Sequence, residues 1–194
     1  MRKNRLPRGS GEDGHEGHDD DGVDPHFWLD PTRYGDVADA IAKHLADVDP
    51  VNADDYRANA KDLTTRLDDL DAEIKDGLSD CSQTDLVTGH AAFGYFADRY
   101  GFDRVAISGL TPDSKPSSAA MADLISYVKK EEVDTIYAET LVPTDLADVI
   151  ARDSGASVKV LDPIAGLSEA SAGDDYFEMM RSNLTTLREG RDCI

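Results

Sequence analysis

The chain has 194 residues, enough for one sizeable core or a lobe and a half, and 40% of them are apolar, which allows a globular fold. Forty acidic residues against 20 basic ones give a formal net charge of −20, which argues against nucleic acid and anionic membranes as partners. An Asp-rich surface that stays soluble at high salt is one interpretation of this charge, and an ordinary acidic protein is the other.

No apolar run reaches the ~18–20 residues of a membrane span. Four basic residues lie within residues 1–8, but no apolar segment follows them, so the sequence as written predicts no export signal. Residues 1–23 are rich in Gly, Asp and Glu and lack apolar periodicity, which predicts a disordered segment. Within it, His15 and His18 alternate with carboxylates. This tract could collect divalent metal weakly, or it could be a solvated acidic tail with two incidental histidines.

The stretch from Asp24 to Pro31 combines two prolines, two carboxylates and three ring side chains in eight residues (DPHFWLDP). This composition is too specific for a linker. We expect His26 to be a metal ligand on a turn restricted by proline. Phe27 and Trp28 are expected to be packing anchors.

Two helices should follow. Asp30 before Pro31 predicts a helix start, with the carboxylate as N-cap, and this helix should end near Val48. Asn52 is expected to cap a second helix that reaches Leu78, because apolar residues recur every three or four positions. At 1.5 Å per residue this helix would be about 40 Å long, a length that suits a spine between two lobes. A short coiled coil is the alternative.

From Asp85 onward, short apolar runs alternate with helical patterns. Strands are predicted at 85–88, 104–107, 134–138 and 157–161, and helices at 91–100, 117–130, 143–153 and 174–188. Strands that are separated by helices predict an α/β fold with a four-stranded parallel sheet and right-handed crossovers.

Polar residues follow each predicted strand: His90, Ser108, Glu139 and Asp162. In open parallel sheets, ligands bind outside the carboxyl ends of the strands. One imidazole and two carboxylates at one sheet edge suit Zn²⁺, Mn²⁺ or Fe²⁺, and His26 could reach the same edge.

Each of these residues also has a structural alternative. His90 could be a surface or capping residue, and Asp162 could start a turn before Pro163. Glu139 could cap the next helix or hydrogen-bond to a histidine ligand. Ser108 is expected to be structural. The common hydrolase, nucleotide-binding and H-E-x-x-H motifs are missing from the sequence, so a metal-dependent hydrolase using Glu139 is only an alternative.

Cys81 and Cys193 are the two cysteines. A disulfide between them would close a loop of more than a hundred residues and stabilise the chain by about 4–5 kcal/mol. Their spacing is equally compatible with two unrelated free thiols.

Three motifs together resemble the zinc- and manganese-binding solute-binding proteins of metal ABC transporters, and most closely their zinc-uptake branch. The motifs are DPHFWLDP at 24–31, VTGHAAFGYFA at 87–97 and LDPIAG at 161–166, and the resemblance covers about residues 15–194. It implies two α/β lobes joined by a long rigid helix, with one metal bound between them. It also implies no enzymatic activity, a location outside the cytoplasm, and delivery of the metal to a membrane permease subunit.

The resemblance implies that His26 and His90 are metal ligands. Asp162 matches the acidic ligand of the manganese branch, and Glu139 matches an acid near the site without an assured ligand role. Zn²⁺ is the expected metal, with Mn²⁺ as the alternative.

Two further features of the chain follow the zinc branch. His15 and His18 resemble its His- and acid-rich loop, which implies an auxiliary metal-binding role. Members of the family often pair cysteines near these positions, which implies a disulfide between Cys81 and Cys193.

The sequence departs from the family because almost nothing precedes the acidic loop, where the first lobe would lie. We therefore expect a partial receptor, with an acidic segment at 1–23, a remnant of the first lobe at 24–50, a linking helix at 51–80 and the second lobe at 81–194. Such a chain would expose the apolar surface that meets the first lobe. A fragment that binds nothing tightly is the alternative to a metal-binding receptor.

Overall fold

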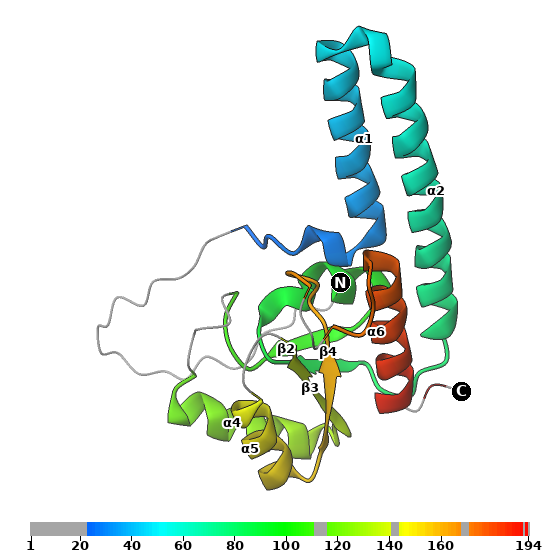
Figure 1. Ribbon diagram of the computed structural model, residues 1–194. Coiled ribbons are helices and arrows are strands. Elements are labelled where there is room, and N and C mark those ends of the chain that lie inside the picture. Colours follow the sequence, from blue (N-terminus) through cyan, green and yellow to red (C-terminus); the bar gives the residue numbers. More distant parts are fainter. Residues whose placement is uncertain (1–22, 111–115, 141–143, 168–170, 192, 194) are drawn as a thin grey trace.

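The second half of the chain folds around a parallel β-sheet, as its alternation of strand and helix patterns predicts (Figure 1). The computed structural model describes residues 23–110, 116–140, 144–167, 171–191 and 193. Its strands are β1 (Asp85–Thr88), β2 (Asp103–Ala106), β3 (Thr135–Glu139) and β4 (Ser157–Leu161). They pair in the order β2-β1-β3-β4, and every pair is parallel, so the predicted α/β class and four-stranded sheet are confirmed.

Helices cover both faces of the sheet. The helices are α1 (Pro31–Val48), α2 (Ala53–Gly77), α3 (Gly94–Tyr100), α4 (Ser118–Lys130), α5 (Asp145–Ser154) and α6 (Tyr176–Gly190). Short 3-10 turns form η1 (Phe27–Leu29), η2 (Pro50–Asn52) and η3 (Ala91–Phe93). In Figure 1, α4 and α5 lie on one side of the sheet and α6 lies on the other.

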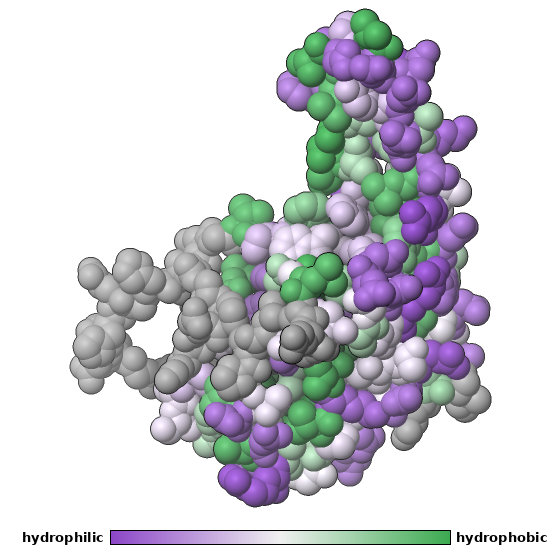
Figure 2. Space-filling view, viewed as in Figure 1, coloured by the Kyte–Doolittle hydropathy of each residue, from purple (hydrophilic) through white to green (hydrophobic). Residues whose placement is uncertain are grey.

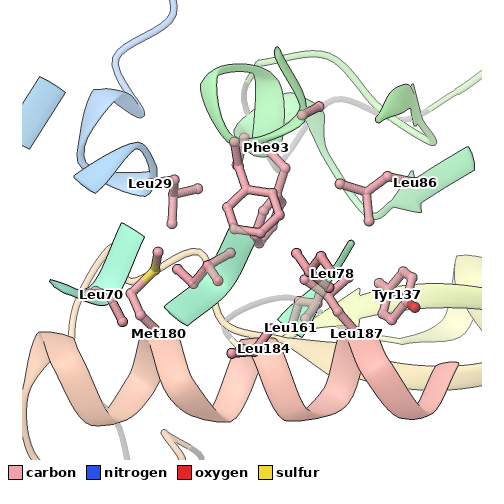
Figure 3. Close-up of a cluster of buried hydrophobic side chains, with 14 of the residues drawn as sticks. Leu29, Leu70, Leu78, Leu86, Phe93, Tyr137, Leu161, Met180, Leu184 and Leu187 are labelled. Atoms are coloured by element: carbon pink, nitrogen blue, oxygen red, sulfur yellow. The ribbon is translucent and has the colours of Figure 1, made fainter. Parts of the chain in front are cut away.

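Two hydrophobic clusters fill the space between the sheet and these helices. Leu86 and Tyr137 point into the cluster that α6 covers, and their neighbours Val87 and Ile136 point into the cluster under α4 and α5. This alternation follows from the two-residue period of a strand. Figure 3 shows α6 placing Met180, Leu184 and Leu187 along one face of the first cluster.

The helices α1 and α2 form a hairpin that projects away from the sheet (Figure 1). The C-terminal half of α2 is anchored in the core by Leu67, Leu70 and Ile74, which are at most 1% exposed. The rest of the hairpin carries apolar side chains in solvent, including Ile41 at 55% and Val48 at 65% exposed. Figure 2 shows hydrophobic residues along one side and at the tip of the hairpin. This part of the hairpin therefore presents apolar surface to solvent.

Most of the predicted helix signals act as expected. The Asp30 carboxylate accepts hydrogen bonds from Thr32 N at 3.0 Å and Arg33 N at 3.4 Å, as an N-cap should. Gly101 ends α3 in the left-handed conformation, with φ of 78°. Asn52 occupies the N-cap position of α2 as predicted, but its side chain makes no capping hydrogen bond. Its amide donates to the Asp49 carboxylate at 2.8 Å, because that strong acceptor lies within reach on the preceding turn.

Some predicted element boundaries also shift. The segment after β1 begins with the 3-10 turn η3 before α3, and α6 begins at Tyr176 rather than at Asp174. Asp175 is its N-cap and accepts from Glu178 N at 2.9 Å. None of the helices in the described part of the chain is long and apolar enough to cross a membrane.

The two ends of the sheet-bearing region are joined covalently. Cys81 and Cys193 form a disulfide with an S–S distance of 1.96 Å, which confirms the pairing that the resemblance implied. The buried Arg191 guanidinium reinforces this junction, because it donates to the carbonyl oxygens of Gln83 and Asp85 at 3.0 and 2.9 Å. The segment after α6 is therefore held against the segment that enters β1.

A buried carboxylate locks the linking helix α2 onto α3. Arg99 donates to both Asp71 oxygens at 2.5 and 2.7 Å, Tyr100 OH donates at 3.0 Å and Lys75 Nζ at 2.8 Å. Burial alone would raise the pKa of the Asp71 carboxyl, but the hydrogen bonds from Arg99, Lys75 and Tyr100 outweigh it and lower the pKa from 3.8 to about 2.

We expect Asp71→Asn to lower the free energy of unfolding at neutral pH. We also expect the stability of the variant to depend less on pH in the acid range. A carboxyl whose pKa is lowered by folding stabilises the fold above its ordinary pKa, and that contribution is lost as pH falls from about 4 to 2. Urea unfolding at pH 6, 4 and 3 should show the difference between wild type and variant shrinking with falling pH. Exposed Asp69→Asn on the same helix is the control. A difference that does not change with pH would contradict this role for Asp71.

Candidate metal site

The candidate site lies at the switch point of the sheet. In the order β2-β1-β3-β4, the chain leaves β1 toward β2 on one side and leaves β3 toward β4 on the other. The strand order therefore reverses between β1 and β3, and α/β proteins place ligands at the carboxyl ends of strands at such a point. His90 follows β1 and Glu139 ends β3, so both lie at this edge of the sheet.

Glu139 holds His90 through two hydrogen bonds. The His90 backbone N donates to Glu139 Oε1 at 2.7 Å, and its ring Nδ1 contacts Oε2. Both residues are buried, at 4% and 3% exposed. Gly89 permits this approach, because a Cβ atom there would lie 2.9 Å from Glu139 Oε1. Of the alternatives for Glu139, the structure therefore favours the hydrogen bond to a histidine.

Asp24 holds His26 in a similar way. Its Oδ1 accepts from the His26 backbone N at 3.0 Å and lies 2.7 Å from the ring Nδ1. His26 is 6% exposed. Sequence reasoning missed this role of Asp24. A signal was available in the sequence, because an Asp side chain often accepts a hydrogen bond from the backbone N–H two residues further on. Two residues after Asp24, that N–H belongs to His26.

The two imidazoles face each other through their Nε2 atoms. The carboxylates occupy both Nδ1 atoms, which leaves the two Nε2 atoms 3.3 Å apart. Two nitrogens bound to a tetrahedral zinc at ~2.0–2.1 Å would be separated by ~3.3–3.4 Å. The spacing of the imidazoles therefore fits two ligands of one zinc ion. In metal sites, a ligand histidine commonly binds the metal through one ring nitrogen and donates its other ring N–H to a carboxylate, as Asp24 and Glu139 allow here.

Asp162 lies directly after β4 and is 5% exposed. Its Oδ1 accepts from Ile164 N at 2.8 Å, as the turn alternative predicted, while Oδ2 has no hydrogen-bond partner in the described residues. Trp28 Nε1 donates to the carbonyl oxygen of Pro163 at 2.9 Å, which ties the segment after β4 to the residues beside His26.

The other residues that the sequence singled out do not join the two imidazoles in the described part of the structure. Among the residues that the structure describes, no group of three or more His, Cys, Asp or Glu side chains is arranged to hold a metal ion, so Asp162 is not gathered with the two imidazoles. Ser108 is structural, since its Oγ donates to Gly89 O at 3.0 Å. His15 and His18 lie outside the described residues.

Comparisons with known proteins agree on one family. The model described as zinc-uptake complex component A, periplasmic (ZnuA), matches residues 2–190. The zinc-binding protein AdcA of Streptococcus pyogenes serotype M6 is 41% identical over 180 residues, which are 90% of this chain and 35% of AdcA. The high-affinity zinc uptake system protein ZnuA of Bacillus subtilis is 36% identical over 169 residues, which are 86% of this chain and 53% of ZnuA.

Solved structures show the same relationship. A mutant structure of the laminin-binding adhesin Lmb from Streptococcus agalactiae superposes with a TM-score of 0.80 at 34% identity, covering 87% of this chain and 63% of Lmb. The chain thus spans between a third and about two thirds of the length of these relatives.

Proposed function

Because this chain belongs to the zinc-binding solute-binding proteins of ABC uptake systems, we propose that His26 and His90 bind one Zn²⁺ ion for delivery to a membrane permease. The family is one of extracytoplasmic metal-binding transport proteins and not of enzymes, so the hydrolase alternative falls away. A disulfide is the expected feature of a protein in an oxidising compartment.

The observation that carries the proposal is the pair of imidazole Nε2 atoms at 3.3 Å, each backed by a carboxylate on its Nδ1. A carboxylate that accepts from Nδ1 keeps the proton there, so Nε2 has its lone pair free for a metal. Asp24 and Glu139 thus prepare the two ligands, and neither needs to bind the metal itself.

Asp162 is not grouped with the two imidazoles in the described residues, and we propose that its unpartnered Oδ2 joins them as a third ligand when zinc binds. Two imidazoles and a carboxylate are a donor set that also tolerates Mn²⁺, although imidazole nitrogen favours Zn²⁺ in the general order of affinities. Zn²⁺ is therefore the proposed cargo and Mn²⁺ the alternative. His15 and His18 would bind further zinc weakly, as a flexible tract of imidazoles and carboxylates can.

The exposed face of the α1–α2 hairpin is the proposed contact for the first lobe that the family resemblance implies. It includes Ile41, Leu45, Val48 and Val51, which are 37% to 92% exposed. An apolar surface of this kind is stable when another part of the protein covers it. A metal bound between lobes would then lie between that lobe and the sheet edge that carries His90 and Glu139.

Calorimetric titration with Zn²⁺ tests the proposal. We expect one tight site, with weaker uptake that disappears in a His15→Ala/His18→Ala variant. Mn²⁺ should compete poorly at equal concentration.

The affinity for zinc should fall as pH is lowered, because protons compete with zinc for imidazole nitrogen. A titration without saturable heat would instead favour the fragment alternative.

Asp24→Asn should lower zinc affinity by about 10–100-fold, the usual effect of losing an outer partner of a metal ligand. The amide keeps the shape of Asp24 but can present its NH₂ group to the ring and so favour the wrong tautomer of His26. The exposed Asp39→Asn on α1 is the matched control and should bind zinc like the wild type. Equal affinities for the two variants would show that Asp24 does not prepare His26.

A further inference from the structure

Asp162 is held in place by an amide on a distant helix. Its backbone N donates to Asn183 Oδ1 at 2.8 Å, and Asn183 Nδ2 donates back to the Asp162 carbonyl oxygen at 2.7 Å. Asn183 lies on α6 and is 4% exposed. A side-chain amide carries both a donor and an acceptor, so it can satisfy both backbone groups of one residue at once.

The edge of the sheet explains why this clamp is needed. β4 is an edge strand that pairs with β3 on one side, and its ladder ends with Glu139 opposite Leu161. Asp162 is the first residue beyond the ladder and yet it is buried, so its backbone groups need partners other than a strand. Asn183 supplies both of them.

The same loop holds a strained residue. Ile164 has φ of 54°, a left-handed conformation that β-branched side chains rarely adopt. Its N donates to Asp162 Oδ1, so the strained turn occupies one carboxylate oxygen and leaves Oδ2 unpartnered. Such strain persists only where surrounding contacts hold it, and it is common at ligand sites.

Helix α6 also anchors the residues beside His26. Tyr176 OH donates to the Trp28 carbonyl oxygen at 2.7 Å, and Trp28 Nε1 donates to Pro163 O at 2.9 Å. Tyr176 and Asn183 are seven residues apart, which is about two turns, so both project from the same face of α6. One helix face therefore holds the segment of His26 and the segment of Asp162.

From these contacts we infer that Asn183 is a positioning residue for zinc binding, which fixes the backbone of Asp162 and so keeps its unpartnered Oδ2 available to a metal held by His26 and His90. This inference rests on the proposed function. Tyr176 holds the segment that contains His26 in a similar way, through its hydrogen bond to the Trp28 carbonyl oxygen. The competing explanation is that the clamp merely packs α6 against β4 and contributes to stability alone.

Asn183→Asp separates the two explanations. The carboxylate still accepts from Asp162 N but can no longer donate to Asp162 O, and it repels the Asp162 side chain. We expect zinc affinity to fall by about 10–100-fold. The visible spectrum of the Co²⁺-loaded variant should shift to that of Co²⁺-loaded Asp162→Asn, because both lose the same oxygen ligand. A double variant should lose little more than either single one.

Two further variants keep the test decisive. Thr185→Ala, at an exposed position of α6, should retain wild-type affinity and spectrum. If Asn183→Asp does not fold, Tyr176→Phe removes only a hydroxyl and should shift affinity and spectrum in the same direction by a smaller amount. A folded Asn183→Asp chain with wild-type affinity and Co²⁺ spectrum, whatever its melting temperature, would overturn the inference. Absence of Zn²⁺ and Co²⁺ binding by the wild type would instead overturn the proposed function, and this inference with it.

Discussion

Zinc affinity should fall by more than about 100-fold when His90 is replaced with alanine, since loss of a ligand costs more than loss of its outer partner. His26→Ala should have an effect of the same size. Each variant removes one of the two nitrogens that lie 3.3 Å apart, and the remaining imidazole cannot bind the ion tightly alone. Calorimetric titration of folded protein at pH 7.5 measures both variants.

The double variant His26→Ala/His90→Ala tests whether both nitrogens bind the same ion. If both nitrogens bind the same ion, removal of the second should add little, because the loss of one ligand has already disabled the site. His44→Ala, at an exposed position of α1, is the control and should titrate like the wild type. Wild-type affinity in both single variants would show that the zinc site lies elsewhere.

The free energy of unfolding should fall by about 4–5 kcal/mol when Cys81 and Cys193 are both replaced with serine. The disulfide joins residues 112 positions apart, so its removal restores a large conformational freedom to the unfolded chain. Urea unfolding followed by circular dichroism measures the change.

Reduced wild-type protein is the matched comparison and should unfold at the same urea concentration as the variant. Zinc affinity should change far less than stability, because the disulfide lies near Arg191 and the entry to β1, while the imidazoles lie at the carboxyl ends of β1 and β3. A loss of less than about 1 kcal/mol would contradict the stabilising role of the disulfide.

Much of the fold follows from patterns that act over short distances. The apolar periods of strands and helices, and the signals at Asp30 and Gly101, place the elements in order. A parallel sheet then brings the residue after β1 and the last residue of β3 to one edge, so the meeting of His90 and Glu139 was within reach of sequence reasoning.

Other parts of the site depend on geometry that no sequence pattern encodes. The clamp on Asp162 comes from Asn183, which is 21 residues further along on a helix whose rotation is set by core packing. The role of Asp24 depends on the rotation of one imidazole ring. The missing capping bond of Asn52 has a similar cause, since the sequence does not show that its side chain turns to donate to the Asp49 carboxylate.

In the proposed site, His26 and His90 together bind one zinc ion. X-ray absorption at the zinc edge, measured on the chain loaded with one equivalent of Zn²⁺, tests this most directly. We predict a first shell of four nitrogen and oxygen ligands at ~2.0–2.1 Å, with the multiple scattering of two imidazole rings. The imidazole contribution should be halved in His90→Ala. A spectrum without imidazole scattering would contradict the account.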